Sequence, residues 1–147
     1  MAKAVQYPPN GTRGVGATLA RASHYNTIPD YITTADEQIC LLLQVESQVG
    51  LKNLDAILAV DNVDGIFIGP ADLAADMGYP GKPETPVVQD AINAAITKIV
   101  ASGKAAGILT ADQSLAKGYI NLGAKFVAVG SDIGLLSMGA KTLRDGF

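Results

Sequence analysis

Long apolar runs, basic clusters and cysteine pairs are all missing from this chain of 147 residues. No apolar stretch approaches the ~20 residues that a membrane-spanning helix needs, so we expect no membrane span. Lysine and arginine total 11 against 14 acidic residues, without any basic run, which argues against nucleic acid as a partner. One cysteine excludes an internal disulfide, and the N-terminus has no signal-peptide core. These features fit a reducing compartment and predict a cytoplasmic location.

Hydrophobic residues make up 48% of the chain, enough for the core of one domain. Apolar strands alternate with amphipathic helices from residue 40 onward, and Cys40 is expected to be a small core side chain. Thr110 and Gln113 have the spacing of a capping box. The expected strands are 40–46, 65–69, 106–110 and 126–130. The expected helices are 17–25, 29–37, 50–59, 71–78 (a short turn), 87–102, one ending near 123, and 134–144.

Four consecutive strand–helix units predict a parallel sheet with right-handed crossovers. A closed barrel of this kind has eight strands and typically ~250 residues, so the sequence predicts half of a barrel with an open edge on each side. We expect a single partial barrel domain over residues 1–147. Residues 1–38 would form a loop and short helices, and residues 39–147 the four units.

Two acidic residues follow neighbouring strands and are candidate metal ligands. Glu46 ends the first apolar run, and Asp72 comes just after the second. Barrel enzymes place ligands at the rim where strands end, and two carboxylates suit a hard cation such as Mg²⁺ or Mn²⁺. Alternatively, Glu46 is a surface acid and Asp72 caps the turn after it. We expect Asp64 and Asp76 to serve turns or solvent, and His24 to be a surface or interface histidine.

Five motifs occur in an order and spacing that resemble the pyruvate aldolases of the HpcH/HpaI family, also called 4-hydroxy-2-oxoheptanedioate aldolases. They are residues 7–16 (Tyr-Pro-Pro-Asn-Gly-Thr-Arg-Gly-Val-Gly), 44–46 (Gln-Val-Glu), 69–73 (Gly-Pro-Ala-Asp-Leu) with Met77-Gly78, 107–109 (Gly-Ile-Leu) and 126–130 (Phe-Val-Ala-Val-Gly). The resemblance implies the C-terminal half of a TIM (β/α)8 barrel of the phosphoenolpyruvate/pyruvate type, namely strands five to eight.

The resemblance also implies a site. Glu46 and Asp72 would bind a divalent metal (Mg, Mn or Co), with Gln44 beside the metal and pyruvate. The other implied substrate-binding groups are the backbone amides of Ala71 and Asp72, the approach shaped by Gly69 and Pro70, and Leu109 next to the aldehyde. The family's arginine and its histidine–aspartate pair have no match among these residues. We therefore assign no catalytic residue beyond the metal site and expect the isolated chain to be inactive.

The implied activity is cleavage of 4-hydroxy-2-oxo acids, such as 4-hydroxy-2-oxoheptanedioate, to pyruvate and an aldehyde, within the catabolism of aromatic compounds. Family members form homo-oligomers that exchange C-terminal helices, which here would use Leu135, Leu136, Met138 and Leu143. Two alternatives stay open. The chain is a non-catalytic truncated remnant that self-associates through its open edges, or it is a citrate-lyase-type carbon–carbon lyase. The latter act on coenzyme A thioesters, and no basic adenine-nucleotide site is evident.

Overall fold

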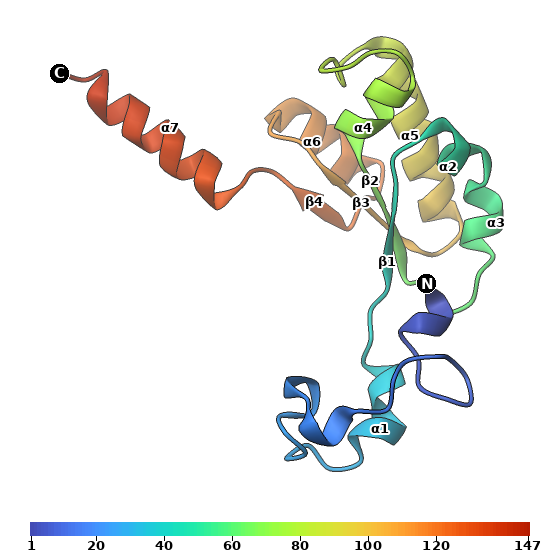
Figure 1. Ribbon diagram of the computed structural model, residues 1–147. Helices are drawn as coiled ribbons and strands as arrows, with labels where there is room; N and C mark the ends of the chain where they lie inside the picture. The colour runs from blue at the N-terminus through green and yellow to red at the C-terminus, as the bar shows by residue number, and fades with distance from the viewer.

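A computed structural model of the chain, covering residues 1–147, contains one parallel sheet in the order β1-β2-β3-β4 (Figure 1). Helices follow each strand, which confirms the expected half of a (β/α)8 barrel built from four strand–helix units. The strands are β1 (Leu42–Val45), β2 (Gly65–Ile68), β3 (Ala105–Leu109) and β4 (Phe126–Ala128). The helices after them are α2 (Gln48–Lys52), α3 (Leu54–Leu58), α4 (Pro70–Asp76), α5 (Pro86–Ala101), α6 (Gln113–Asn121) and α7 (Asp132–Arg144).

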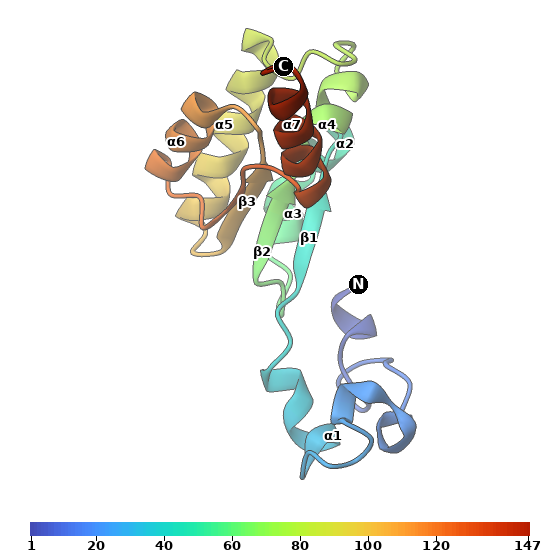
Figure 2. The same cartoon turned by 90° about the vertical axis from the view of Figure 1, so that its left-hand side faces the viewer.

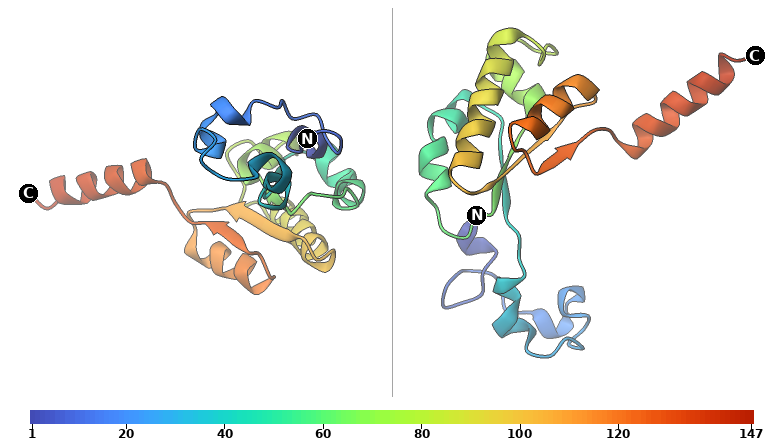
Figure 3. Two further views of the ribbon diagram at one scale, coloured as in Figure 1. Left: turned by 90° about the horizontal axis from the view of Figure 1, so that it is seen from below. Right: turned by 180° about the vertical axis from the view of Figure 1, so that it is seen from behind.

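The core lies between the sheet and the helices on one of its faces. Ile66, Ile68 and Ile108 are fully buried there, because alternate residues of a strand point to the same face. Val88 and Ile92 of α5 belong to the same core, as the periodicity of residues 87–102 predicts. Figure 3 shows α5 lying along the sheet while α7 points away from it.

The opposite face of the sheet carries a row of side chains across all four strands. The register aligns Gln44 with Phe67, Phe67 with Gly107, and Gly107 with Phe126. The rings of Phe67 and Phe126 meet over Gly107, with their centroids 5.6 Å apart. A Cβ at Gly107 would lie 2.8 Å from Phe67, so the glycine makes room for this aromatic pair. This face corresponds to the inside of a barrel wall.

The N-terminal segment forms a small separate cluster beyond the amino ends of the strands (Figure 2). Tyr7, Ala17 and Ala35 are buried together, and Tyr31 packs against them. The Arg13 guanidinium lies 4.5 Å from the centre of the Tyr7 ring and donates to the Tyr31 hydroxyl at 3.2 Å. The short elements of this segment are η1 (Ala2–Ala4), η2 (Ala17–Leu19), η3 (Arg21–Ser23), α1 (Tyr31–Thr34) and η4 (Ala35–Glu37).

Several predicted helices differ from the structure. The helix expected at 17–25 is two short 3-10 turns, and that at 29–37 is a single α-helical turn followed by a 3-10 turn. The helix expected at 50–59 is split into α2 and α3 at Asn53. Where α2 ends, the carbonyl of Val49 accepts from both the backbone amide and the side-chain amide of Asn53, at 3.1 and 2.9 Å.

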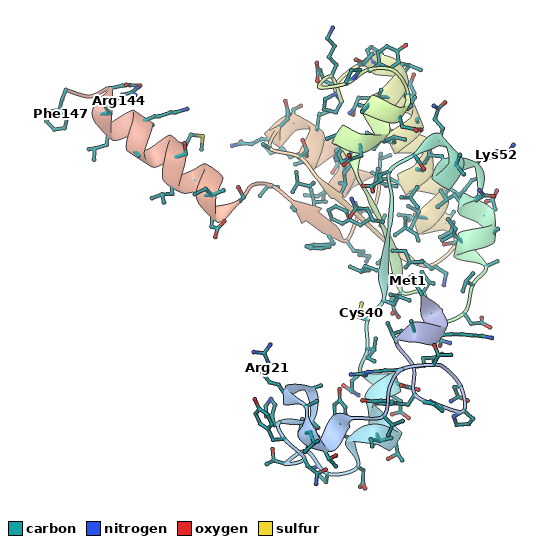
Figure 4. All side chains as sticks on the ribbon, viewed as in Figure 1. Met1, Arg21, Cys40, Lys52, Arg144 and Phe147 are labelled. Carbon is teal, nitrogen blue, oxygen red and sulfur yellow. The ribbon has the colours of Figure 1, made fainter.

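Two predictions about single residues were also wrong. Cys40 is exposed, because β1 begins only at Leu42 and Cys40 lies in the connection from the N-terminal segment (Figure 4). The cap of α6 is Asp112, whose carboxylate accepts from the amides of Ser114 and Leu115 at 2.7 and 2.9 Å. Thr110 lies two residues earlier, and its hydroxyl accepts from the amide of Asp112 instead.

The last helix, α7, extends away from the rest of the molecule and contains no buried residue (Figure 1). Ser131 caps it by accepting from the amide of Gly134 at 3.1 Å. Its apolar side chains are exposed, notably Leu135, Leu136, Met138 and Leu143. None of the helices combines the length and apolar character needed to cross a membrane.

Candidate functional site

The carboxyl ends of β1 and β2 lie side by side, because the strands pair in parallel with Val45 opposite Ile68. Glu46 and Gly69 come next on the two strands, and the amide of Gly69 donates to the carbonyl of Val45 at 3.1 Å. A Cβ added at Gly69 would lie 2.8 Å from Glu46 Oε2. The carboxylate of Glu46 therefore rests against the junction between β2 and α4.

Asp72 stands in the first turn of α4, which begins directly after Gly69. Three helical residues advance about 4.5 Å along the helix axis. The backbone of Asp72 is therefore within one helical turn of Gly69, against which the Glu46 carboxylate rests. No side chain caps α4, and the amide of Gly69 is already bonded to Val45. The alternative that Asp72 caps this turn is wrong, and its exposed carboxylate is available to a ligand.

Gln44 completes this group from the same face of β1. Its Nε2 donates to Glu46 Oε2 at 2.5 Å, which fixes the orientation of the carboxylate. No group of three or more histidine, cysteine or acidic side chains gathers anywhere in the structure. Two carboxylates and an amide supply only oxygen ligands, which fit a hard divalent cation with its remaining positions open to substrate or water.

A cavity of about 400 Å³ opens beside α4 and brings Pro70, Ala71 and Leu109 together. Gln44, Glu46, Gly69 and Asp72 are not among the residues that line it. The other lining residues are Pro83, Glu84, Gln89, Thr110, Ala111, Asp112, Leu115 and Tyr119. The residues expected to bind substrate thus fall into two neighbouring groups, which meet where α4 begins.

Sequence reasoning missed two residues of this cavity, Gln89 and Tyr119. The Tyr119 hydroxyl donates to Gln89 Oε1 at 2.8 Å, and Gln89 Nε2 donates to the carbonyl of Pro83 at 2.8 Å. Burial raises the pKa of Tyr119; the bond to Gln89 opposes that rise, and the charge of Asp112 adds to it. Gln89 lies on α5 and Tyr119 on α6, 30 positions apart, and no local sequence pattern predicts a contact between two such residues.

Asp64 and Asp76 have structural roles, as the sequence predicts. Asp64 accepts from the amide of Leu41 at 2.6 Å, and Asp76 accepts from the amide of Gln48 at 2.7 Å. Asp64 therefore joins the residue before β2 to the residue before β1, and Asp76 joins the end of α4 to the start of α2. His24 is exposed and belongs to the N-terminal segment, which lies beyond the amino ends of the strands (Figure 2).

The parallel sheet with two acids at its carboxyl rim belongs to the class of (β/α)8-barrel proteins. Comparison with known proteins shows the family. The model of the HpcH/HpaI aldolase/citrate lyase family matches residues 1–138. The chain belongs to this family.

Among its relatives is the 4-hydroxy-2-oxo-heptane-1,7-dioate aldolase of Escherichia coli, which is 57% identical over 141 residues. That match covers 96% of this chain and 54% of the relative. The hydroxypyruvate/pyruvate aldolase of Pseudomonas aeruginosa is 56% identical over 147 residues, which are 100% of this chain and 55% of that protein. The chain thus spans about half the length of the curated relatives it matches.

A solved structure of an HpcH/HpaI aldolase/citrate lyase family protein from Burkholderia cenocepacia superimposes with a TM-score of 0.89 at 32% identity. It covers 98% of this chain, which in turn spans 58% of that structure. The half barrel is therefore a piece of a known architecture, with its strands in the same arrangement.

Proposed function

We propose that the chain carries the metal- and pyruvate-binding half of a class II aldolase. The reaction would be cleavage of a 4-hydroxy-2-oxo acid to pyruvate and an aldehyde. 4-Hydroxy-2-oxoheptanedioate, the compound in the name of one relative, belongs to this class. The observation that carries the proposal is the carboxylate of Glu46 held against Gly69, one helical turn from the unpaired carboxylate of Asp72.

Glu46 and Asp72 would hold the cation, and Gln44 would keep the Glu46 carboxylate turned toward it. A bound divalent metal supplies stabilisation of the negative charge that develops on the oxygens of pyruvate. Two carboxylates match the charge of a divalent ion and occupy only some of its coordination positions. The other positions are left for the substrate.

The backbone around Ala71 is suited to the carboxylate of pyruvate. Amides in the first turn of a helix have no partner within the helix, so those of Ala71 and Asp72 remain available as donors. Gly69 lacks a side chain and Pro70 fixes the first helical residue, so the substrate could approach the backbone closely. Leu109, half exposed at the end of β3, would border the aldehyde.

Proton transfer is assigned to no residue of this chain. The only histidine, His24, is exposed in the N-terminal segment. By the resemblance given above, the family's arginine and histidine–aspartate pair have no counterpart in this chain. We therefore expect the purified chain to bind metal but to release no pyruvate by itself. Pyruvate release at a rate typical of aldolases would contradict this part of the proposal.

Metal binding tests the proposal directly. Isothermal titration of the chain with Mn²⁺ should show one site, and Glu46→Gln or Asp72→Asn should each weaken it at least tenfold, about 1.4 kcal/mol. Both changes keep the size of the side chain and remove its charge. Glu37→Gln, which alters an exposed acid of the N-terminal segment, should leave the affinity unchanged. Equal affinity in all three variants would place the metal elsewhere.

Assembly into homo-oligomers is the second part of the proposal. The free-standing helix α7 presents an apolar surface that a single copy leaves in water. The surface continues into a groove of about 590 Å³ between α6 and the start of α7, lined in part by Ile120, Leu135 and Met138. Exposed apolar surface of this kind is typical of an interface.

A non-catalytic chain that self-associates is the competing function. The sheet order leaves one side of β1 and one side of β4 without a partner strand, and such edges favour association. This alternative requires no affinity for metal. The Mn²⁺ titration therefore separates it from the aldolase proposal.

A further inference from the structure

One face of the sheet has no other element packed on it. The core and its helices lie on the opposite face, and the N-terminal segment lies beyond the amino ends of the strands (Figure 2). The uncovered face carries Leu42, Phe67 and Phe126, because alternate residues of each strand share a face. Leu42 is 40% exposed and Phe126 is 52% exposed. Apolar side chains left together in water in this way mark a surface that another protein surface covers.

The two edges of the sheet are open as well. The order β1-β2-β3-β4 leaves β1 and β4 each with one unpaired side. All three strand pairs are parallel, so both open edges run in the same direction. An open edge carries backbone donors and acceptors that a further strand can bond. A partner for this molecule therefore has to offer parallel strands to both edges.

A second copy of the chain fits both edges at once. When a two-fold axis along the centre of the barrel relates two copies, β4 of one copy lies beside β1 of the other. The same pairing is repeated on the opposite side, and all eight strands point the same way. Eight parallel strands are the number that closes a barrel of this type. Closure leaves no edge, because every strand is then paired on both sides.

Closure also covers the exposed apolar face. The interior of such a barrel is filled with side chains and is a packed core rather than a pore. Leu42, Phe67 and Phe126 of each copy would face this interior, where side chains of the other copy replace water around them. The gain in buried apolar surface and the new backbone bonds at two edges both favour the pair over the single chain.

We propose that two copies of this chain close around each other into one eight-stranded barrel, with β4 of each copy paired to β1 of the other. The carboxyl ends of all the strands then lie at one mouth, so the second copy supplies the wall opposite Glu46 and Asp72. In a single copy that side of the site is open to water. The inference goes beyond the proposed function, because closure depends on the edges and the apolar face and requires no bound metal.

The mass of the chain in solution is the first test. Leu135→Asp/Leu136→Asp serves as the background, because it removes the separate contact expected of α7. Sedimentation equilibrium of this background should give twice the mass of one chain. Adding Phe126→Asp should raise the dissociation constant of the pair by about a hundredfold or more, since the charge would be buried inside the barrel. Val87→Asp, at an exposed valine of α5, should leave the pair intact.

Hydrogen exchange in the same background tests which edges meet. Within one copy β1 and β4 lie at opposite edges, with β2 and β3 between them. Phe126→Asp in β4 should nevertheless speed the exchange of the amides of Leu42–Val45 by about tenfold, because β1 loses the β4 strand of the other copy. Leu42→Asp should have the reciprocal effect on the amides of Phe126–Ala128. Retained protection of β2, which is paired on both sides in either state, shows that both variants stay folded.

Three results would overturn the inference: a strict monomer in the α7 background, a pair that survives Phe126→Asp, or unchanged exchange of the far edge in both variants. A strict monomer would leave the open face to a different polypeptide. The Mn²⁺ titration is independent of these measurements. Loss of the metal site in a chain that still pairs would count against the proposed aldolase alone. A normal Mn²⁺ site in a monomer would count against the closed pair alone.

Discussion

Gly69 is the residue on which the geometry of the rim depends most. Its missing side chain leaves room for the ends of Glu46 and Gln44, at 2.8 and 2.9 Å from the position of a Cβ. Its backbone angles, φ −95° and ψ 93°, are open to other residues, so the requirement comes from the close approach alone. A side chain at this position would have to displace the carboxylate.

Gly69→Ala should therefore weaken Mn²⁺ binding by about tenfold while the chain stays folded. The methyl group would push Glu46 Oε2 out of its place, and it would also lie 2.9 Å from the Cβ of Glu46, so the ends of β1 and β2 must shift slightly. Isothermal titration and circular dichroism measure the two effects. Gly118→Ala is the matched control, because a Cβ there meets nothing within 4 Å. Unchanged affinity in Gly69→Ala would show that the carboxylate position is irrelevant to the metal.

Tyr119 links the cavity to the stability of the fold. Its hydroxyl is the donor for Gln89 Oε1, and the residue is 2% exposed. Tyr119→Phe should lower the free energy of unfolding by about 1 kcal/mol at neutral pH, because the Gln89 oxygen loses its donor. Urea unfolding measures this loss. Tyr25→Phe, at an exposed tyrosine, should change the free energy little.

The pH dependence of the same pair follows from the raised pKa of Tyr119. Burial makes the folded chain hold the phenol proton to higher pH than the unfolded chain, in which the pKa is near 10.0. The resulting stability is fully present below that value and is lost as the pH rises through the folded pKa. The unaltered chain should therefore lose stability more steeply than Tyr119→Phe above pH 10. Identical slopes for the two chains would contradict this.

At the scale of elements, predictions from periodicity were most accurate where apolar residues recur over many turns. The helix expected at 87–102 is Pro86–Ala101, and the strand expected at 65–69 is Gly65–Ile68. Short segments were predicted less well, since local side-chain bonds decide them. Asn53 lies at the junction of α2 and α3 with its side chain bonded to Val49, and Asp112 rather than Thr110 caps α6.

Helix α7 is the element whose role is most open to test. Replacing both Leu135 and Leu136 with Asp should shift the chain toward smaller species in analytical ultracentrifugation, because charges would enter the expected interface. Neither leucine is buried within one copy, so the stability of the sheet should be unaffected. Asp132→Asn is the control, because it changes a polar side chain of the same helix and removes no apolar side chain. An unchanged sedimentation profile in the double variant would rule out α7 as the contact.

At the scale of the whole molecule, the alternation of strands and helices was enough to predict a half barrel. It was also enough to predict that Glu46 and Asp72 emerge at one rim, because both follow neighbouring parallel strands. The cavity could not be predicted in this way. Its walls come from α4, β3, α5 and α6, and the bond between Tyr119 and Gln89 depends on how those helices pack.

The most direct measurement is anomalous diffraction from crystals of the chain grown with Mn²⁺ and pyruvate. One anomalous peak should lie within coordination distance, about 2.0–2.4 Å, of a carboxylate oxygen of Glu46 and of one from Asp72. Pyruvate should take further positions on the same ion, beside Ala71. A peak that touches only one of these two acids, or that lies away from the ends of β1 and β2, would contradict the shared site.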